Sequence, residues 1–433
     1  MEVRGPAASP PNIDGSVPAA PATRREFVLS VSAATAGLLA PRVSLAESRD
    51  ATVRRGLAST PGDFLFEPGL TYLQTGSLGP TPVRVMEQVM AHWRELERNP
   101  THYAYGAHEV AMEEVRAKVG AFVGASRDEI VLTGCTTDGM NLVASGLSLE
   151  RGDHVLTTDQ EHPGGRSGWE WLQRTRGIVL EDVPIPPGSD DPRPIIDAFA
   201  RRLSSRTKVV MCSHVLTSTG YRMPVAEIAA LARAHGALCV VDGAQAAGGI
   251  VVDVKALGCD AYVAPGHKWM LGPKGTGFLY LSSALGDRVL PVQLQAGRAA
   301  YSASNGVRSL PSVLGLAGAI DYTLAIGRER IEREALRLAK RVHEGVQELA
   351  RTQGRGLRVV SAPPGPHASP LVTYELPASR PAGEWQRRLH ARHGVYVKVV
   401  PANFLNGHRI STHLFNTDAD VDRLLAALRT ELD

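Results

Sequence analysis

Short apolar runs alternate with helical segments along the middle of the chain, and this alternation constrains the fold more than any other feature. Seven runs of four to six residues are expected to be strands: 129–133, 154–158, 178–183, 208–213, 237–241, 261–264 and 277–281. Apolar residues recur at helical spacing in segments between them, namely 138–147, 165–176, 194–203 and 224–234. Strands this apolar are typical of a parallel sheet buried on both faces. The sequence therefore predicts an α/β fold, with a mostly parallel seven-stranded sheet covered by helices and ligands at the carboxyl ends of the strands.

The pattern changes after residue 310. Two helical segments are followed by a loop rich in Pro and Gly, and then by shorter strands and helices. The expected helices are 312–326, 329–352, 384–393 and 418–432, and the expected strands are 371–375, 396–400 and 409–412. We predict an N-terminal arm over residues 47–75, a large domain over 76–310 and a smaller α+β C-terminal domain over 311–433.

The first 46 residues have the composition of a targeting segment. Arg24 and Arg25 precede Phe27, an apolar run over residues 28–40 and a small-residue cleavage pattern at 44–46. Paired arginines before such a run resemble a twin-arginine export signal, which is read by the twin-arginine export machinery. This route carries folded proteins, so we expect a cofactor-bearing protein that is periplasmic or secreted. The sequence leaves open whether the signal is cleaved.

Composition argues against several classes of partner. The net charge is +3 and no block of Lys and Arg stands out, which makes nucleic acid an improbable partner. The four cysteines, Cys135, Cys212, Cys239 and Cys259, form no CxxC pair. A disulfide framework or a metal site is therefore not expected.

Lys268 and Asp242 are the strongest candidates for chemistry. Asp242 ends an apolar strand, and Lys268 lies in an apolar segment bounded by glycines. Burial lowers the pKa of an amine and makes it a nucleophile toward aldehydes. A carboxylate beside a pyridine nitrogen keeps that nitrogen protonated, so that the ring can accept electrons from a breaking Cα bond. The pair indicates pyridoxal-5′-phosphate (PLP) held as a Schiff base on Lys268.

The segment over residues 132–138 is a candidate phosphate site. It joins a strand to a helix and contains Cys135, Thr136 and Thr137. Free N–H groups at a helix start, together with two hydroxyls, form an anion cradle. The segment lacks both the Walker lysine and the GxGxxG spacing, so a single phosphate fits better than a nucleotide.

Taken together, these motifs resemble the class V aminotransferase family of fold-type-I PLP-dependent enzymes, and most of all its isopenicillin N epimerase-like members. The matching segments follow the family's order over nearly all of residues 70–430. They are 72–80, 99–102, 129–137, 161–163, 213–220, 241–245, 267–280 and 409–417.

The resemblance implies a role for each matching residue. Lys268 would hold the cofactor and move the Cα proton, Asp242 would pair with the pyridine nitrogen, and His162 would stack on the ring. The other implied cofactor-binding residues are Gln245 and Thr217 at the phenolic oxygen, with Thr136, Thr137, Cys135 and His267 at the phosphate. Arg409 would bind the substrate carboxylate through two parallel hydrogen bonds, and Ser77 and Tyr103 are further substrate-binding candidates.

Two positions depart from the family pattern. Many relatives have Ser or Thr three residues before the lysine, where this chain has Pro265. A Gly-Thr that reaches the neighbouring subunit's phosphate in many relatives corresponds to Gly306 and Val307 here. The phosphate site would therefore be completed differently, with Ser304 and Asn305 as candidates.

The sequence narrows the reaction without fixing it. All four cysteines precede Lys268, whereas persulfide-forming desulfurases of the family use a cysteine well after the lysine. The resemblance implies aminotransferase- or epimerase-type chemistry at the Cα of an amino acid, or of an amino-acid unit in a peptide or secondary metabolite, in a homodimer. A PLP-dependent C–S lyase is the alternative, and a non-catalytic PLP-binding protein is a second one.

Overall fold

The computed structural model describes residues 61–304, 308–353 and 356–432 of the 433-residue chain. The predicted export signal lies outside these residues, as do Asn305 and Val307. No helix in these ranges has by itself the length and apolar composition of a membrane span; α11 (Leu310–Ile326) and α12 (Arg328–Gln353) meet that criterion only when joined across a 76° bend.

A seven-stranded sheet forms the centre of the molecule, with strand order β2-β8-β7-β6-β5-β3-β4. Its strands are β2 (Ile130–Thr133), β3 (His154–Thr158), β4 (Val179–Val183), β5 (Thr207–Ser213), β6 (Leu238–Asp242), β7 (Ala261–Pro265) and β8 (Gly277–Leu281). β8 is antiparallel to both of its neighbours, and the other pairs are parallel. The prediction of a mostly parallel seven-stranded sheet is therefore confirmed.

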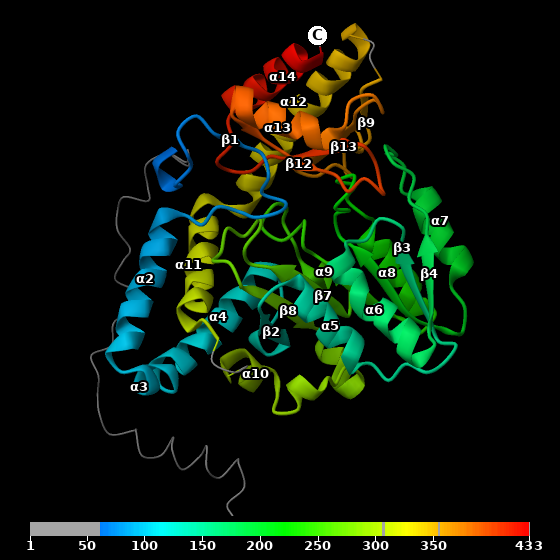
Figure 1. Ribbon diagram of the computed structural model, residues 1–433. Coiled ribbons are helices and arrows are strands. Elements are labelled where there is room, and N and C mark those ends of the chain that lie inside the picture. Colours follow the sequence, from blue (N-terminus) through cyan, green and yellow to red (C-terminus); the bar gives the residue numbers. More distant parts are fainter. Residues whose placement is uncertain (1–60, 305–307, 354–355, 433) are drawn as a thin grey trace, which may run out of the picture. The chain divides into compact units, whose positions relative to one another are not determined.

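Successive residues of each strand enter opposite hydrophobic cores, as the two-residue period of a strand requires. Val240 and Val263 belong to one core, while Val241 and Ala264 belong to the other. The first core includes residues of α5 (Thr136–Gly146) and α6 (Pro163–Arg176). The second includes residues of α4 (Ala107–Val123), α7 (Arg193–Arg202), α8 (Val225–Ala234) and α11. Helices thus cover both faces, which explains why the strands are apolar on both sides (Figure 1).

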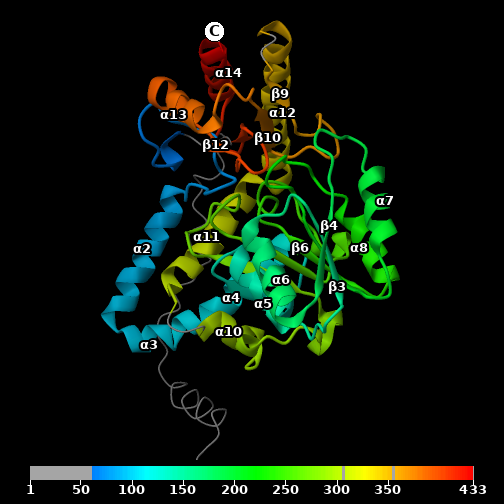
Figure 2. The same cartoon turned by 45° about the vertical axis from the view of Figure 1, so that its right-hand side comes forward.

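The C-terminal segment forms a second layer with its own core. Its four-stranded sheet has the order β12-β13-β10-β9. The strands are β9 (Arg358–Val359), β10 (Leu371–Glu375), β12 (Lys398–Val399) and β13 (Gly407–Ser411). α12, α13 (Ala382–His393) and α14 (Asp418–Leu432) contribute apolar residues to one cluster with this sheet (Figure 2). Leu73 of the arm joins the same cluster.

The segment 396–400, expected as one strand, is divided between two sheets. β11 (Val395–Tyr396) pairs in parallel with β1 (Thr71–Tyr72), and β12 pairs antiparallel with β13. An apolar run shows that a strand is present but does not show which partner each residue has.

Several helices match the expected segments closely, and shorter ones were not expected. α7 and α14 are among the former. α2 (Val83–Arg98) packs with α4 against α11. The unexpected helices are α3 (Pro100–Ala104), α9 (Val254–Leu257) and α10 (Arg298–Ser304). Each is too short to show a repeating apolar face.

Candidate active site

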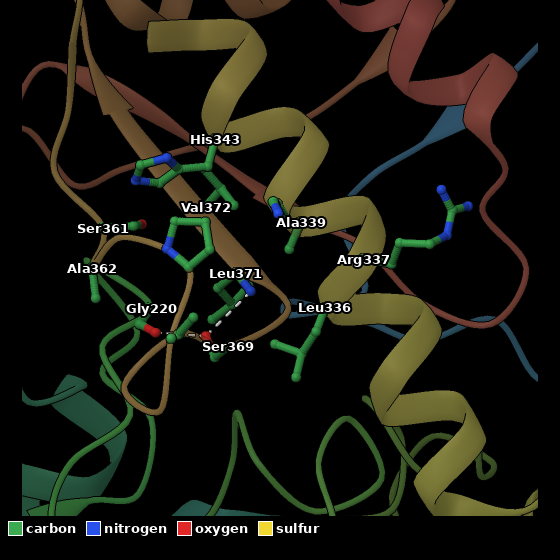
Figure 3. Close-up of a pocket in the computed structure, with 14 residues that line it drawn as sticks. Gly220, Leu336, Arg337, Ala339, His343, Ser361, Ala362, Ser369, Leu371 and Val372 are labelled. Atoms are coloured by element: carbon green, nitrogen blue, oxygen red, sulfur yellow. Dashed lines mark hydrogen bonds between the residues drawn. The ribbon is translucent and has the colours of Figure 1, made fainter. Parts of the chain in front are cut away.

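One cavity in the described part of the chain contains nearly all of the predicted site residues. This cavity has a volume of about 510 Å³ and lies at the carboxyl ends of β5, β6 and β7. Its lining includes Lys268, Asp242, His162, Gln245, Thr217, Thr136, Thr137, Cys135, His267, Arg409 and Ser77. A second cavity, of about 230 Å³, lies between α12, β10 and the loop over residues 361–369, and none of the predicted residues lines it (Figure 3).

Lys268 follows β7 and is held by the segment that follows the N-terminal arm. The Gly79 N–H donates to the His267 carbonyl at 2.9 Å, and a Cβ atom at position 79 would lie 1.9 Å from the Lys268 carbonyl oxygen. Only glycine allows this approach. Leu271, three residues later, has a φ of 57°, an uncommon conformation for a residue other than glycine. The close contact with Gly79 therefore restrains the lysine backbone.

Burial lowers the pKa of the Lys268 amine to about 8. The negative charge of Asp242 opposes this effect, whereas the positive charge of Arg409 adds to it. At physiological pH, a larger fraction of the Lys268 amine is therefore neutral than would be the case for an exposed lysine. The neutral form is the one that can attack an aldehyde or accept a proton.

Asp242 ends β6 and has only 3% of its surface exposed. Its Oδ1 atom accepts the Ala244 N–H at 2.8 Å. Burial raises the pKa of this carboxyl, while the hydrogen bond from Ala244 and the charge of Lys268 lower it. A buried carboxylate is stabilised by a cationic partner. A protonated pyridine nitrogen in the cavity would be such a partner.

The start of α5 presents unused polar groups to the same cavity. The Thr136 hydroxyl and the His267 Nδ1 atom are both buried without a hydrogen-bond partner. Cys135 occupies the N-cap position of α5, and no side chain caps the N–H groups of this helix. Buried polar atoms are rarely left unpaired, and helix N-termini favour anions. These groups therefore fit a bound phosphate.

A hydrogen-bond network joins Gln245, Thr217, Arg409 and Ser77. Gln245 Nε2 donates to the Gly76 carbonyl at 2.8 Å and to Thr217 Oγ1 at 3.3 Å. Arg409 Nη1 donates to Thr217 O at 2.9 Å and to Thr217 Oγ1 at 2.8 Å, while Nη2 donates to Ser77 Oγ at 3.4 Å. The Arg409 Nε atom is buried without a partner, and burial lowers the pKa of this guanidinium to about 10. The network holds the guanidinium at the cavity and leaves it a donor for a carboxylate.

His162 caps α6 and is oriented by that role. Its Nδ1 atom accepts the Gly164 N–H at 3.0 Å, which places the ring proton on Nε2. Burial lowers the pKa of His162, and the positive charges of Lys268, Arg409 and Lys398 lower it further. The imidazole of His162 is therefore neutral, and a neutral ring suits stacking on an aromatic ring.

The structure adds cavity residues that were not predicted. Glu161 accepts hydrogen bonds from Ser213 and Thr158, and burial raises its pKa to about 7. Lys398, Val400, Pro401, Asn403 and Phe404 come from the segment before β13. In the sequence, these five residues are marked only by their closeness to Arg409 along the chain. The strand pairing that brings them to the cavity cannot be read from the sequence.

Tyr103 lies on α3 and is not among the residues that line this cavity. Its ring is 5.1 Å from the ring of His102, centroid to centroid. α3 packs against α2 and α4 rather than at the carboxyl ends of the strands. Its role in substrate binding stays a prediction.

Known proteins resemble this chain over most of its length. The family model "Aminotransferase class-V" matches residues 71–424. An isopenicillin N epimerase of Streptomyces clavuligerus is 31% identical over 85% of this chain and 96% of its own length. A probable cysteine desulfurase of Methanothermobacter thermautotrophicus is 33% identical over 64% of this chain and 72% of its own length. A solved structure of the cystine C–S lyase C-DES with cysteine persulfide has a TM-score of 0.76 at 23% identity, covering 84% of this chain and 98% of its own.

The fold agrees with these matches, and so do the unpaired polar groups at α5 and the buried Lys268–Asp242 pair. The chain belongs to the aminotransferase class-V family and is a PLP-dependent enzyme.

Proposed function

We propose that this enzyme acts at the Cα of an amino acid, or of an amino-acid unit within a peptide or secondary metabolite, by aminotransferase- or epimerase-type chemistry. One observation carries the proposal: Lys268, with its lowered pKa, lines the same cavity as the buried Asp242 and Arg409. When bound, PLP supplies an electron-accepting ring that stabilises the charge left by a broken Cα bond.

The chain's own residues account for the remaining functions. The Thr136 hydroxyl, His267 and the N-terminus of α5 would bind the phosphate, and Asp242 would face the pyridine nitrogen. Arg409 would orient the substrate by its carboxylate. The Lys268 Nζ atom would then take and return the Cα proton, because a base with a pKa near the working pH transfers protons efficiently.

The position of the cysteines supports Cα chemistry over persulfide formation. Cys135 lines the cavity at the predicted phosphate site, and Cys212, Cys239 and Cys259 are buried. After Lys268, the described lining consists of Lys398, Val400, Pro401, Asn403, Phe404 and Arg409, with no cysteine among them. The part of the described cavity lining that follows Lys268 in the sequence therefore has no nucleophilic cysteine of the desulfurase type.

Isotope exchange tests the proposal. We expect the holoenzyme in D₂O to replace the Cα proton of its substrate with deuterium, which loss of the Cα signal in proton NMR would record. Epimerisation would also invert the configuration, whereas transamination would require an oxo-acid acceptor. Release of an oxo acid and a thiol or sulfide from a cysteine derivative, without exchange in other amino acids, would contradict the proposal in favour of a C–S lyase.

The lowered pKa of Lys268 gives an expected pH dependence. Burial disfavours the ammonium form, so neutral amine is lost as pH falls through about 8 rather than through the ordinary value of 10.5. After removal of the cofactor, carbamylation of Lys268 by cyanate should reach half its maximal rate near pH 8, as measured by peptide mass spectrometry. Asp242→Asn should move this midpoint lower, because the Asp242 charge raises the lysine pKa. A midpoint near 10.5 in both proteins would contradict the burial of the amine.

We also propose that the enzyme acts after export as a homodimer. The Arg24-Arg25 pair and the apolar run after it support export, and family resemblance supports the dimer. Arg24→Lys/Arg25→Lys should retain the protein in the cytoplasm, as cell fractionation would show, and sedimentation should give twice the chain mass. Unchanged export in the double variant, or a monomer, would contradict the respective part.

A further inference from the structure

Lys398 and Arg409 lie directly opposite each other on neighbouring strands. β12 and β13 are antiparallel, and their register pairs Lys398 with Arg409. Directly opposed residues of such a pair project from the same face, with Cβ atoms about 4.5–5.5 Å apart. Both side chains line the cavity that contains Lys268.

In the described ranges, neither Lys398 nor Arg409 forms an ion pair with a carboxylate, and no carboxylate is among the groups that shift the pKa of either side chain. The hydrogen bonds of Arg409 go to neutral oxygens of Thr217 and Ser77. Like charges placed directly opposite each other destabilise a sheet. The pair therefore has an unfavourable interaction that an anion in the cavity would offset.

The other charged groups of the cavity do not neutralise the pair. Glu161 is hydrogen-bonded to Ser213 and Thr158, and Asp159 accepts the Ile185 N–H at 3.0 Å. The remaining carboxylate, Asp242, interacts with Lys268. Burial, and then the positive charge of Arg409, lower the pKa of Lys398; burial lowers the pKa of His162, and both cations lower it further. Positive charge therefore predominates at this end of the cavity.

We propose that Lys398 and Arg409 together bind a substrate with two anionic groups: Arg409 binds the α-carboxylate and Lys398 binds a second carboxylate on the substrate side chain. Val400 and Phe404 line the same wall and give apolar contact for the carbon chain between the two groups. The inference rests on the proposed function, because it assumes that Arg409 binds the carboxylate of an amino acid that reacts at Cα. It makes Lys398 a specificity-determining residue.

The test compares matched amino acids on the holoenzyme. L-glutamate and L-2-aminoadipate have a second carboxylate, and L-glutamine and L-norleucine serve as their neutral counterparts. Dissociation constants come from the change in cofactor absorbance on titration. We expect the dicarboxylates to bind about 10- to 100-fold more tightly, the range for a hydrogen bond to a charged group. Lys398→Met should remove this preference by weakening the dicarboxylates alone, and Lys398→Arg should retain most of it.

Two further measurements separate specificity from folding and cofactor binding. Because Lys398→Met removes one of two opposed like charges, its melting temperature without ligand should be equal to or above that of the wild type. Its affinity for PLP should be unchanged. Equal binding of both probe classes by the wild type, equal weakening of both in Lys398→Met, or loss of PLP affinity would each overturn the assignment.

Failure of the inference is distinguishable from failure of the proposed function. Cα exchange without a preference for dicarboxylates would overturn the role of Lys398 and leave the Cα chemistry standing. An absence of spectral change and of Cα exchange with every free amino acid, and with peptides that contain the same residues, would overturn both.

Discussion

Lys268→Ala is expected to abolish the covalent attachment of the cofactor and to slow Cα proton exchange by about 10²- to 10⁴-fold, the range for loss of a general base. The physical reason is that Lys268 combines a position in the cavity with a pKa lowered by burial. The absorbance band of bound cofactor, about 410–430 nm for a protonated PLP Schiff base, should be lost. Borohydride reduction followed by peptide mapping should place the cofactor on Lys268 in the wild type alone.

Lys274 offers a matched control for this substitution. Burial also lowers its pKa, but its Nζ atom donates to the Gly79 carbonyl at 2.8 Å and to Thr81 Oγ1 at 3.1 Å, and it does not line the cavity. Lys274→Ala should therefore keep the absorbance band and the reduction product. Attachment of the cofactor to Lys274, or full exchange activity in Lys268→Ala, would show that the assignment of the lysine is wrong.

Asp242→Asn is expected to lower the rate of Cα proton exchange by about 10²- to 10³-fold, the range for loss of one electrostatic contact to developing charge. The change removes the negative charge but retains an oxygen that can accept the Ala244 N–H. Folding should therefore be preserved while the pyridine nitrogen loses the group that keeps it protonated. Stopped-flow exchange or turnover measurements, with circular dichroism for the fold, would check both parts.

Asp260→Asn provides the comparison. The Oδ2 atom of Asp260 accepts the Cys239 N–H at 2.8 Å, and Asp260 immediately precedes β7, at the amino end of this interior strand and away from the cavity at its carboxyl end. This variant loses a similar carboxylate at a strand end without affecting the site, so its exchange rate should remain near that of the wild type. Equal losses in both variants would mean that Asp242 acts through folding rather than through the cofactor.

The local pattern of the sequence was sufficient to predict the central sheet and much of the site. A strand with two buried faces must be apolar along its whole length, and a helix on a sheet must repeat its apolar residues, so both leave periodic signals in the chain. Asp242 was identifiable because a charged residue ends such an apolar run. The segment before α5, which lines the cavity, was identifiable because a strand leads directly into a helix start with hydroxyl residues.

The tertiary structure decided what depends on contacts between distant parts of the chain. In the sequence, Lys268 and Lys274 are two lysines in one glycine-rich segment. In the structure, Gly79 contacts the backbone at Lys268, and its carbonyl accepts a hydrogen bond from Lys274. The opposition of Lys398 and Arg409 arises from strand register, which no local periodicity encodes. Short helices such as α3 escaped prediction, and Tyr103 on it proved to lie outside the cavity lining. Hydrophobic periodicity reports which face of an element is buried, whereas side-chain neighbours in a site are set by pairing and packing across long sequence separations.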